Sequence, residues 1–172
     1  MSKIRLKGLI EEDFLNYRLP SMFLATCFCD FKCEKEDLTG ATFCQNSSLA
    51  RAPIIETEIK TLIDKYINNP ISKAIVVGGM EPFSQFEELT NLIKEFRIYT
   101  KDPFVIYTGY DSNEICEQVE SLIPYGNIIV KYGRYKCNNP GRYDEVLGIH
   151  LASDNQYACY YGRFFDENAN KS

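Results

Sequence analysis

The most distinctive chemical feature of the sequence is a cluster of thiols near the N-terminus. Four of the seven cysteines lie within eighteen residues: Cys27, Cys29, Cys33 and Cys44. Where thiols stay reduced, clustered cysteines are more often metal ligands or catalytic groups than disulfides. The odd total of seven also argues against a fully paired disulfide framework. The cluster therefore indicates a metal site.

Two kinds of metal site fit these thiols. Structural zinc usually takes two close Cys pairs, or Cys and His pairs, but the sequence has no Cys-x2-Cys and only one histidine, His150. An iron–sulfur cluster is held by thiolates, usually four, and a cluster held by three leaves one iron open for another ligand. Cys29 and Cys33 are spaced Cys-x3-Cys, and Cys44 follows after ten residues. Zinc in this one Cys-rich loop is an open alternative.

The other cysteines are predicted to be buried small side chains, because free cysteine is among the most buried residue types. Cys116 lies in a predicted helix, Cys159 in an aromatic strand, and Cys137 in a polar loop. Cys27 is expected to be buried at a strand end. A second possibility is that Cys27 replaces Cys29 as a ligand.

Length and charge limit the class of protein. A chain of 172 residues suits one domain, which we place at 1–165 with a polar tail at 166–172. The net charge of −5 argues against nonspecific nucleic-acid binding. The sequence starts without a secretory-signal pattern, and no apolar run reaches the ~20 residues that a membrane span needs. A cytoplasmic location, with no membrane or nucleic-acid partner, is the expectation.

Strand and helix patterns alternate along the chain. Strands are predicted at 3–10, 21–26, 73–79, 103–110, 126–133 and 156–162, and helices at 56–67, 83–99 and 111–123. This order predicts an α/β fold with a mostly parallel sheet of about five or six strands. A closed barrel of eight units takes ~250 residues, so we expect an open, partial barrel. The site should lie at the carboxyl ends of the strands.

Several polar or glycine-rich segments lie at or just after the ends of those strands, or at the start of the last one. Their candidate binding residues are Gly78, Gly79, Glu81, Thr108, Tyr110, Asn155 and Gln156. Each has a purely structural alternative. The glycines suit a tight turn, Glu81 suits a helix cap, and Thr108 to Tyr110 suit a strand-to-helix turn. Asn155 and Gln156 suit an exposed turn before the last strand.

Together these segments resemble the radical S-adenosylmethionine enzymes, and within them the activating subunits of anaerobic ribonucleotide reductase. The family motif is Cys-x3-Cys-x-aromatic-Cys; this chain has Cys29-x3-Cys33 and then Phe43-Cys44, with the second gap widened to ten residues. Further similar segments follow in order: Gln45-Asn46, "VVGGMEP" with Met80 inserted, "YTGY", "IIVKYGRY" and "LASDNQ". The similarity runs from residue 3 to about residue 160.

The resemblance implies a [4Fe–4S] cluster on Cys29, Cys33 and Cys44, with an open iron that binds S-adenosylmethionine. Its reductive cleavage would give methionine and a 5′-deoxyadenosyl radical, which would take a hydrogen from a glycine on a partner. The implied partner is a glycyl-radical enzyme, the large subunit of anaerobic ribonucleotide reductase, and the implied electron donor is a flavodoxin or a ferredoxin. The glycines, Glu81 and the other candidate binding residues would then contact S-adenosylmethionine.

Two other functions stay open on the sequence alone. One is a non-catalytic module that binds zinc or an iron–sulfur cluster and docks to a partner, which would tolerate the widened cysteine spacing and Met80. The other is a radical S-adenosylmethionine enzyme with a different substrate, because the abstracted hydrogen belongs to the substrate.

Overall fold

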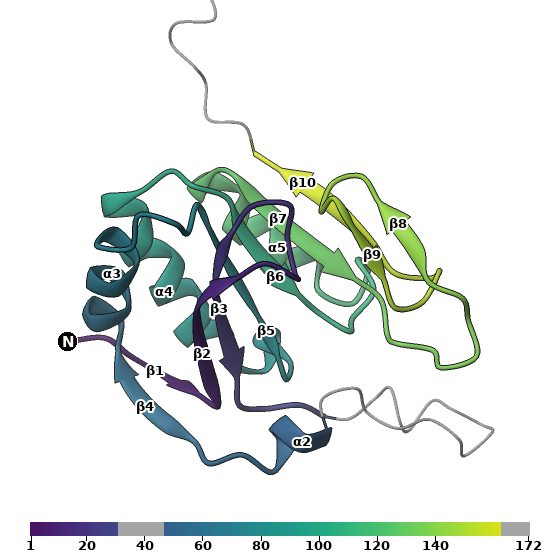
Figure 1. Cartoon of the computed structure of the whole chain (residues 1–172), viewed down its shortest axis with the longest axis horizontal. Coiled ribbons are helices and arrows are strands. Elements are labelled where there is room, and N and C mark those ends of the chain that lie inside the picture. Colours follow the sequence, from purple (N-terminus) through teal and green to yellow (C-terminus); the bar gives the residue numbers. More distant parts are fainter. Residues whose placement is uncertain (31–46, 163–172) are drawn as a thin grey trace, which may run out of the picture.

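The computed structural model describes residues 1–30 and 47–162 (Figure 1). Cys33, Cys44 and the expected tail at 166–172 lie outside these residues, so their predicted roles stay predictions.

A six-stranded sheet forms the centre of the fold, in the order β10-β7-β6-β5-β3-β2. The four inner strands are parallel, and β2 and β10 pair antiparallel at the two edges. The strands are β2 (Gly8–Asp13), β3 (Ser21–Thr26), β5 (Ala74–Gly79), β6 (Phe104–Tyr107), β7 (Ile128–Tyr132) and β10 (Tyr157–Tyr161). The prediction of an open, mostly parallel sheet of about six strands is confirmed, and the sheet does not close on itself.

One face of the sheet packs against helices. These are α3 (Ile59–Ile67), α4 (Phe86–Tyr99) and α5 (Cys116–Leu122), with the 3-10 turns η1 (Pro82–Gln85) and η2 (Ile123–Tyr125). Apolar residues recur on one side of each helix, as a core-facing helix requires. They meet alternate residues of β3, β5, β6 and β7 in the larger core, in which Phe96 lies between Tyr66 and Phe104.

The opposite face of the sheet has a smaller apolar cluster. It is covered by a hairpin of β8 (Arg142–Asp144) and β9 (Ile149–Leu151) and by Tyr17 from the loop between β2 and β3. Leu147 and Leu151 of the hairpin pack on Val76, Val105 and Ile129 of the sheet. Figure 1 shows this hairpin on the side of the molecule away from α3.

A second, two-stranded sheet, formed by β1 (Lys3–Leu6) and β4 (Ile55–Glu58), corrects two expected boundaries. The predicted strand at 3–10 divides into β1 and β2, which belong to different sheets. The predicted helix at 56–67 begins only at Ile59, because β4 pairs with β1. A short helix, α2 (Ser47–Ala50), precedes β4.

The third predicted helix, 111–123, also begins late, at Cys116. Asp111 and Glu114 have the spacing of a capping box, and the Asp111 backbone N–H donates to the Glu114 carboxylate at 2.8 Å. This bond closes a turn ahead of the helix rather than the first turn of the helix itself.

Candidate functional site

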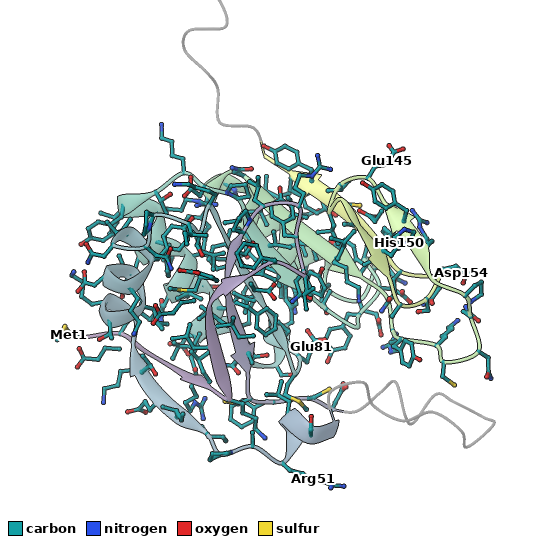
Figure 2. All side chains as sticks on the ribbon, in the orientation of Figure 1. Met1, Arg51, Glu81, Glu145, His150 and Asp154 are labelled. Atoms are coloured by element: carbon teal, nitrogen blue, oxygen red, sulfur yellow. The ribbon has the colours of Figure 1, made fainter. Side chains whose placement is uncertain are left out.

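The carboxyl ends of the four parallel strands meet at one edge of the sheet. Thr26 at the end of β3 is opposite Gly79 at the end of β5, and Tyr107 of β6 is opposite Lys131 of β7. The loops that follow these strands therefore start side by side, as the sequence predicts. Figure 2 shows Glu81 at this edge, on the same side of the molecule as α2.

The first cysteines leave β3 at this edge. The Cys27 side chain is buried and Cys29 is half-buried. Burial raises the pKa of the Cys27 thiol, which disfavours the thiolate that metal binding needs. In residues 1–30 and 47–162, no three His, Cys, Asp or Glu side chains come together to hold a metal ion. A cluster bound through Cys29 therefore needs ligands from outside these residues, where Cys33 and Cys44 lie.

Hydrogen bonds from the next loop fix the backbone of this cysteine segment. The side-chain oxygen of Gln85 accepts the Cys27 N–H at 2.9 Å, and the Glu81 N–H donates to the Phe28 carbonyl at 2.7 Å. The buried Gln85 amide also donates to the Arg5 carbonyl at 3.0 Å, which links β1 to the same point. Because backbone groups and a buried amide make these bonds, the start of the loop is held in one conformation.

Tyr110 fixes the other end of the described cysteine segment. Its hydroxyl donates to the Asp30 carboxylate at 2.9 Å. Burial and this hydrogen bond raise the pKa of Tyr110 to about 12, so the hydroxyl keeps its proton and remains a donor. Arg134 lies over the Tyr110 ring at 5.8 Å and donates to Glu114 at 2.8 Å. The loops after β3, β6 and β7 are thus joined through Tyr110.

Glu81 links the ends of β5 and β6. One carboxylate oxygen accepts the Thr108 hydroxyl at 2.8 Å and the Phe83 N–H at 3.1 Å, and the other accepts the Gly109 N–H at 2.9 Å. Burial raises the pKa of Glu81, and these three donors oppose that effect. Glu81 therefore caps the first turn of η1, which is the structural role that the sequence offered as an alternative. Contact between Glu81 and a substrate stays a prediction.

The two glycines after β5 are required by close packing. Gly79 has a φ of +82°, and a Cβ there would lie 2.8 Å from side-chain carbons of both Ala25 and Leu49. A Cβ on Gly78 would lie 3.3 Å from both the Phe23 ring and the Tyr107 Cβ. A larger residue at Gly79 would therefore force backbone strain and displace α2 or β3.

A cavity of about 220 Å³ lies beside these glycines, on the face of the sheet that the helices do not cover. Its floor is formed by Phe23, Gly79, Tyr107 and Lys131 of four neighbouring strands, and its walls come from two segments. The walls are Leu15 and Asn16 of the β2–β3 loop, and Ile149, His150, Leu151, Ala152 and Gln156 around β9.

Strand alternation explains why the cavity is polar at this end. On this face β6 presents Val105 and then Tyr107, and β7 presents Ile129 and then Lys131. The buried Lys131 ammonium lies 5.5 Å from the centre of the Tyr107 ring and 3.4 Å from the Gly133 carbonyl. A cation therefore lies next to the cavity, deep at the carboxyl end of β7.

Of the last two candidate residues, Gln156 lines the cavity and Asn155 precedes it in the chain. Gln156 is buried, so the alternative of an exposed turn was wrong for it. Its amide donates to the Gly133 carbonyl at 3.2 Å and accepts the Ser153 N–H at 3.2 Å. Asn155 donates to the Arg134 carbonyl at 2.8 Å. The Asn155 side-chain oxygen is buried and accepts no hydrogen bond among the described residues.

Sequence reasoning missed Gln85, Lys131 and Asn16. A lysine inside an apolar strand such as "IIVKYG" is a signal that could have revealed Lys131, because lysine is rarely buried unless its charge has a partner. Neither Gln85 nor Asn16 carries such a signal. His150, which we expected to be packed or exposed, is exposed against Tyr143 and lies at the rim of the cavity.

Fold and site together define an α/β protein with a cysteine loop at the carboxyl edge of a parallel sheet. A family model described as a 4Fe-4S single cluster domain matches residues 21–156. The match covers more than half of the chain, so the chain belongs to this family and is an iron–sulfur protein. A search of curated proteins and a search of solved structures gave no match.

The residues present fit such a cluster. Cys29 is partly exposed at the end of β3, its loop is held by neighbouring hydrogen bonds, and thiolates are the ligands that iron–sulfur clusters take. Among the described residues, no helix has the length and apolarity to cross a membrane.

Proposed function

We propose that the protein is a radical S-adenosylmethionine activating enzyme that installs a glycyl radical on a partner enzyme. The partner proposed is the large subunit of anaerobic ribonucleotide reductase, and the proposed location is the cytoplasm. The observation that carries the proposal is the direct bonding between the motif segments. The loops that begin with Cys29, Glu81 and Thr108 are joined at one edge by hydrogen bonds, beside a cavity with a polar end.

Cys29, Cys33 and Cys44 would hold the cluster, and one iron would stay open. A bound cluster would supply one electron, received from a flavodoxin or ferredoxin, for the cleavage of S-adenosylmethionine into methionine and a 5′-deoxyadenosyl radical. The radical would take a hydrogen atom from the target glycine, so the expected products are methionine, 5′-deoxyadenosine and a glycyl radical on the partner. This assignment accounts for the thiols and the cavity with one reaction.

The chain's own residues would position the reactants. The backbone of Gly78 and Gly79 would allow close approach at the end of β5, because neither has a side chain to fill the space. Tyr110 and Gln85 hold the loop that carries Cys29. The buried Asn155 oxygen, which accepts no hydrogen bond among the described residues, would accept one from an amino group such as that of adenine. Glu81 and Thr108 keep β5 and β6 in register around the cavity.

Lys131 would act as an electrostatic group at the cavity. An ammonium next to a partly enclosed cavity favours a negatively charged group there. Phe23, Ile149 and Leu151 around it would limit the entry of water, which protects a radical from side reactions.

The test is anaerobic reconstitution with iron and sulfide. The reduced protein should give the EPR signal of a [4Fe–4S] cluster, the signal should shift when S-adenosylmethionine is added, and 5′-deoxyadenosine should form. Alanine variants of Cys29, Cys33 and Cys44 should each lose the cluster. The matched control is Cys116→Ala, because Cys116 on α5 is an exposed thiol and the prediction that it is buried was wrong.

Three other outcomes would replace the proposal. If Cys29→Ala keeps the cluster and Cys27→Ala loses it, Cys27 is the cluster ligand in place of Cys29. A metal site that leaves S-adenosylmethionine intact would favour the docking module. Formation of 5′-deoxyadenosine without radical transfer to the reductase would indicate a different substrate.

A further inference from the structure

Strand β2 and the loop that joins it to β3 expose a group of apolar side chains. Five of the large apolar residues exposed in the described part of the chain fall within residues 9–19: Leu9, Ile10, Phe14, Leu15 and Leu19. Phe14 is 62% exposed and its neighbour Leu15 is 79% exposed. We call Phe14 and Leu15 the apolar tip. Single exposed apolar residues are ordinary, but a contiguous group often marks an interaction site.

The apolar tip stands on a loop whose base is tightly bonded. The Asp13 carboxylate accepts both the backbone N–H and the side-chain amide of Asn16, at 3.1 and 2.9 Å. The Tyr107 hydroxyl donates to the Asn16 carbonyl at 2.5 Å, and the Arg18 N–H donates to the Leu147 carbonyl at 2.8 Å. The loop is therefore fixed to β6 and to the segment before β9, and the tip is held outward by this framework.

The apolar tip is continuous with the cavity. Leu15 and Asn16 form part of the cavity wall, and the same Tyr107 that bonds Asn16 forms part of its floor. The cavity volume of about 220 Å³ is below the ~300–1,000 Å³ of pockets that enclose a drug-sized ligand. Only a small part of any substrate fits inside, so a polypeptide that inserts one segment must lie against the rim, where the tip is.

We infer that the apolar tip is a docking surface for the protein substrate, and that it binds an apolar side chain next to the segment that enters the cavity. This inference rests on the proposed function, because it takes the substrate to be a polypeptide. The occupant is a segment of the glycyl-radical partner. Burial of Phe14 and Leu15 would give affinity, because removal of apolar surface from water drives most protein association.

The experiment compares the wild-type chain with the double variant Phe14→Ser/Leu15→Ser. The matched control is Ile98→Ser, which removes a similarly exposed apolar side chain (75%) from α4, among the helices that cover the other face. The reconstituted proteins are tested anaerobically with purified anaerobic ribonucleotide reductase large subunit. Three readouts are taken: binding by calorimetry, glycyl-radical yield by EPR, and 5′-deoxyadenosine formed with dithionite in the absence of the partner.

The expected result for the double variant is at least tenfold weaker binding and a similar fall in the rate of radical formation. The single variant Phe14→Ser leaves the cavity wall intact, so its 5′-deoxyadenosine formation without partner should match the wild type. Ile98→Ser should match the wild type in all three readouts. Unchanged binding and radical transfer in the double variant would overturn the inference and leave the proposed function intact. No 5′-deoxyadenosine from the wild type would overturn the proposed function and, with it, the inference.

Light scattering on the same samples tests whether a second copy of this chain binds the apolar tip instead. A wild-type dimer that becomes monomeric in the double variant, with the control still dimeric, would assign the apolar tip to self-association and overturn docking of the partner. A melting temperature equal to the wild type in each variant would exclude misfolding, and exposed side chains such as these are expected to meet that condition.

Discussion

The two faces of the central sheet are built from the same strands but serve different purposes. The face toward α3, α4 and α5 is filled by apolar side chains along the whole length of the strands. The other face is apolar only in its first part, at Val76, Val105 and Ile129. Toward the carboxyl edge it changes to Gly78, Tyr107 and Lys131, which lie in or beside the cavity.

The difference shows how a single strand can contribute to both stability and a site. Successive side chains of a strand point to opposite faces, so β7 sends Val130 into the helix-covered core and Lys131 to the cavity. The floor of the cavity is therefore built on the central strands, and placement on regular elements favours accurate positioning of reacting groups. Substitutions on the two faces should separate stability from function.

The largest effect on stability is expected on the helix-covered face. Phe96→Ala removes a fully buried ring that touches Tyr66 and Phe104. Removal of such a ring leaves a cavity, and the free energy of unfolding should fall by about 3–5 kcal/mol. Urea denaturation monitored by circular dichroism measures this change. A loss below ~1 kcal/mol would mean that the core repacks around the gap.

A smaller loss of stability is expected from Glu81→Gln, in the loop that follows β5 at the carboxyl edge of the sheet. Three donors point at the Glu81 carboxylate, and an amide would place its own N–H against at least one of them. A buried donor without an acceptor costs about 1–3 kcal/mol. Cluster content after reconstitution, measured by iron analysis and absorbance, should fall as well, because a shift of residue 81 would also move the backbone N–H that it donates to the Phe28 carbonyl. Full cluster content would show that the carboxylate does not position the loop.

A still smaller loss of stability, about 0.5–1.5 kcal/mol, is expected from Tyr110→Phe, which removes one hydrogen bond to Asp30. Its matched control is Tyr66→Phe on the helix-covered face, which removes a hydroxyl bonded to Asp102 at 2.5 Å. Both variants should lose similar stability in urea, but only Tyr110→Phe should alter the EPR line shape of the reduced cluster. Equal EPR spectra in the two variants would show that the Tyr110 hydroxyl does not position Cys29.

The smallest effect on stability is expected from Lys131→Met, on the cavity face. Lys131 is buried, and replacement of a buried cation by an apolar side chain of similar length relieves its desolvation. The free energy of unfolding should change by less than about 1 kcal/mol in either direction. The KM for S-adenosylmethionine or the yield of glycyl radical should nevertheless worsen at least tenfold. A variant with unchanged kinetics would exclude an electrostatic role for Lys131.

The positions of the central strands could be predicted from the sequence, because they depend on runs of neighbouring apolar side chains. "KAIVVGG" and "PFVIYTGY" are runs that a buried parallel strand requires, and they became β5 and β6. The boundaries at Ile59 and Cys116 were not readable. The first depends on pairing between β1 and β4, which are separated by some fifty residues, and the second depends on a turn closed by Glu114.

The sequence by itself determined the chemical nature of the site: clustered thiols, glycines at a strand end, and an α/β fold whose parallel strands bring their loops to one edge. Only the tertiary structure decided which side chains complete that site. Gln85 reaches Cys27 across 58 positions and Tyr110 reaches Asp30 across 80. Such contacts form because folding brings distant segments together around a shared core, and no local pattern in the chain encodes which distant partner a glutamine or a tyrosine will meet.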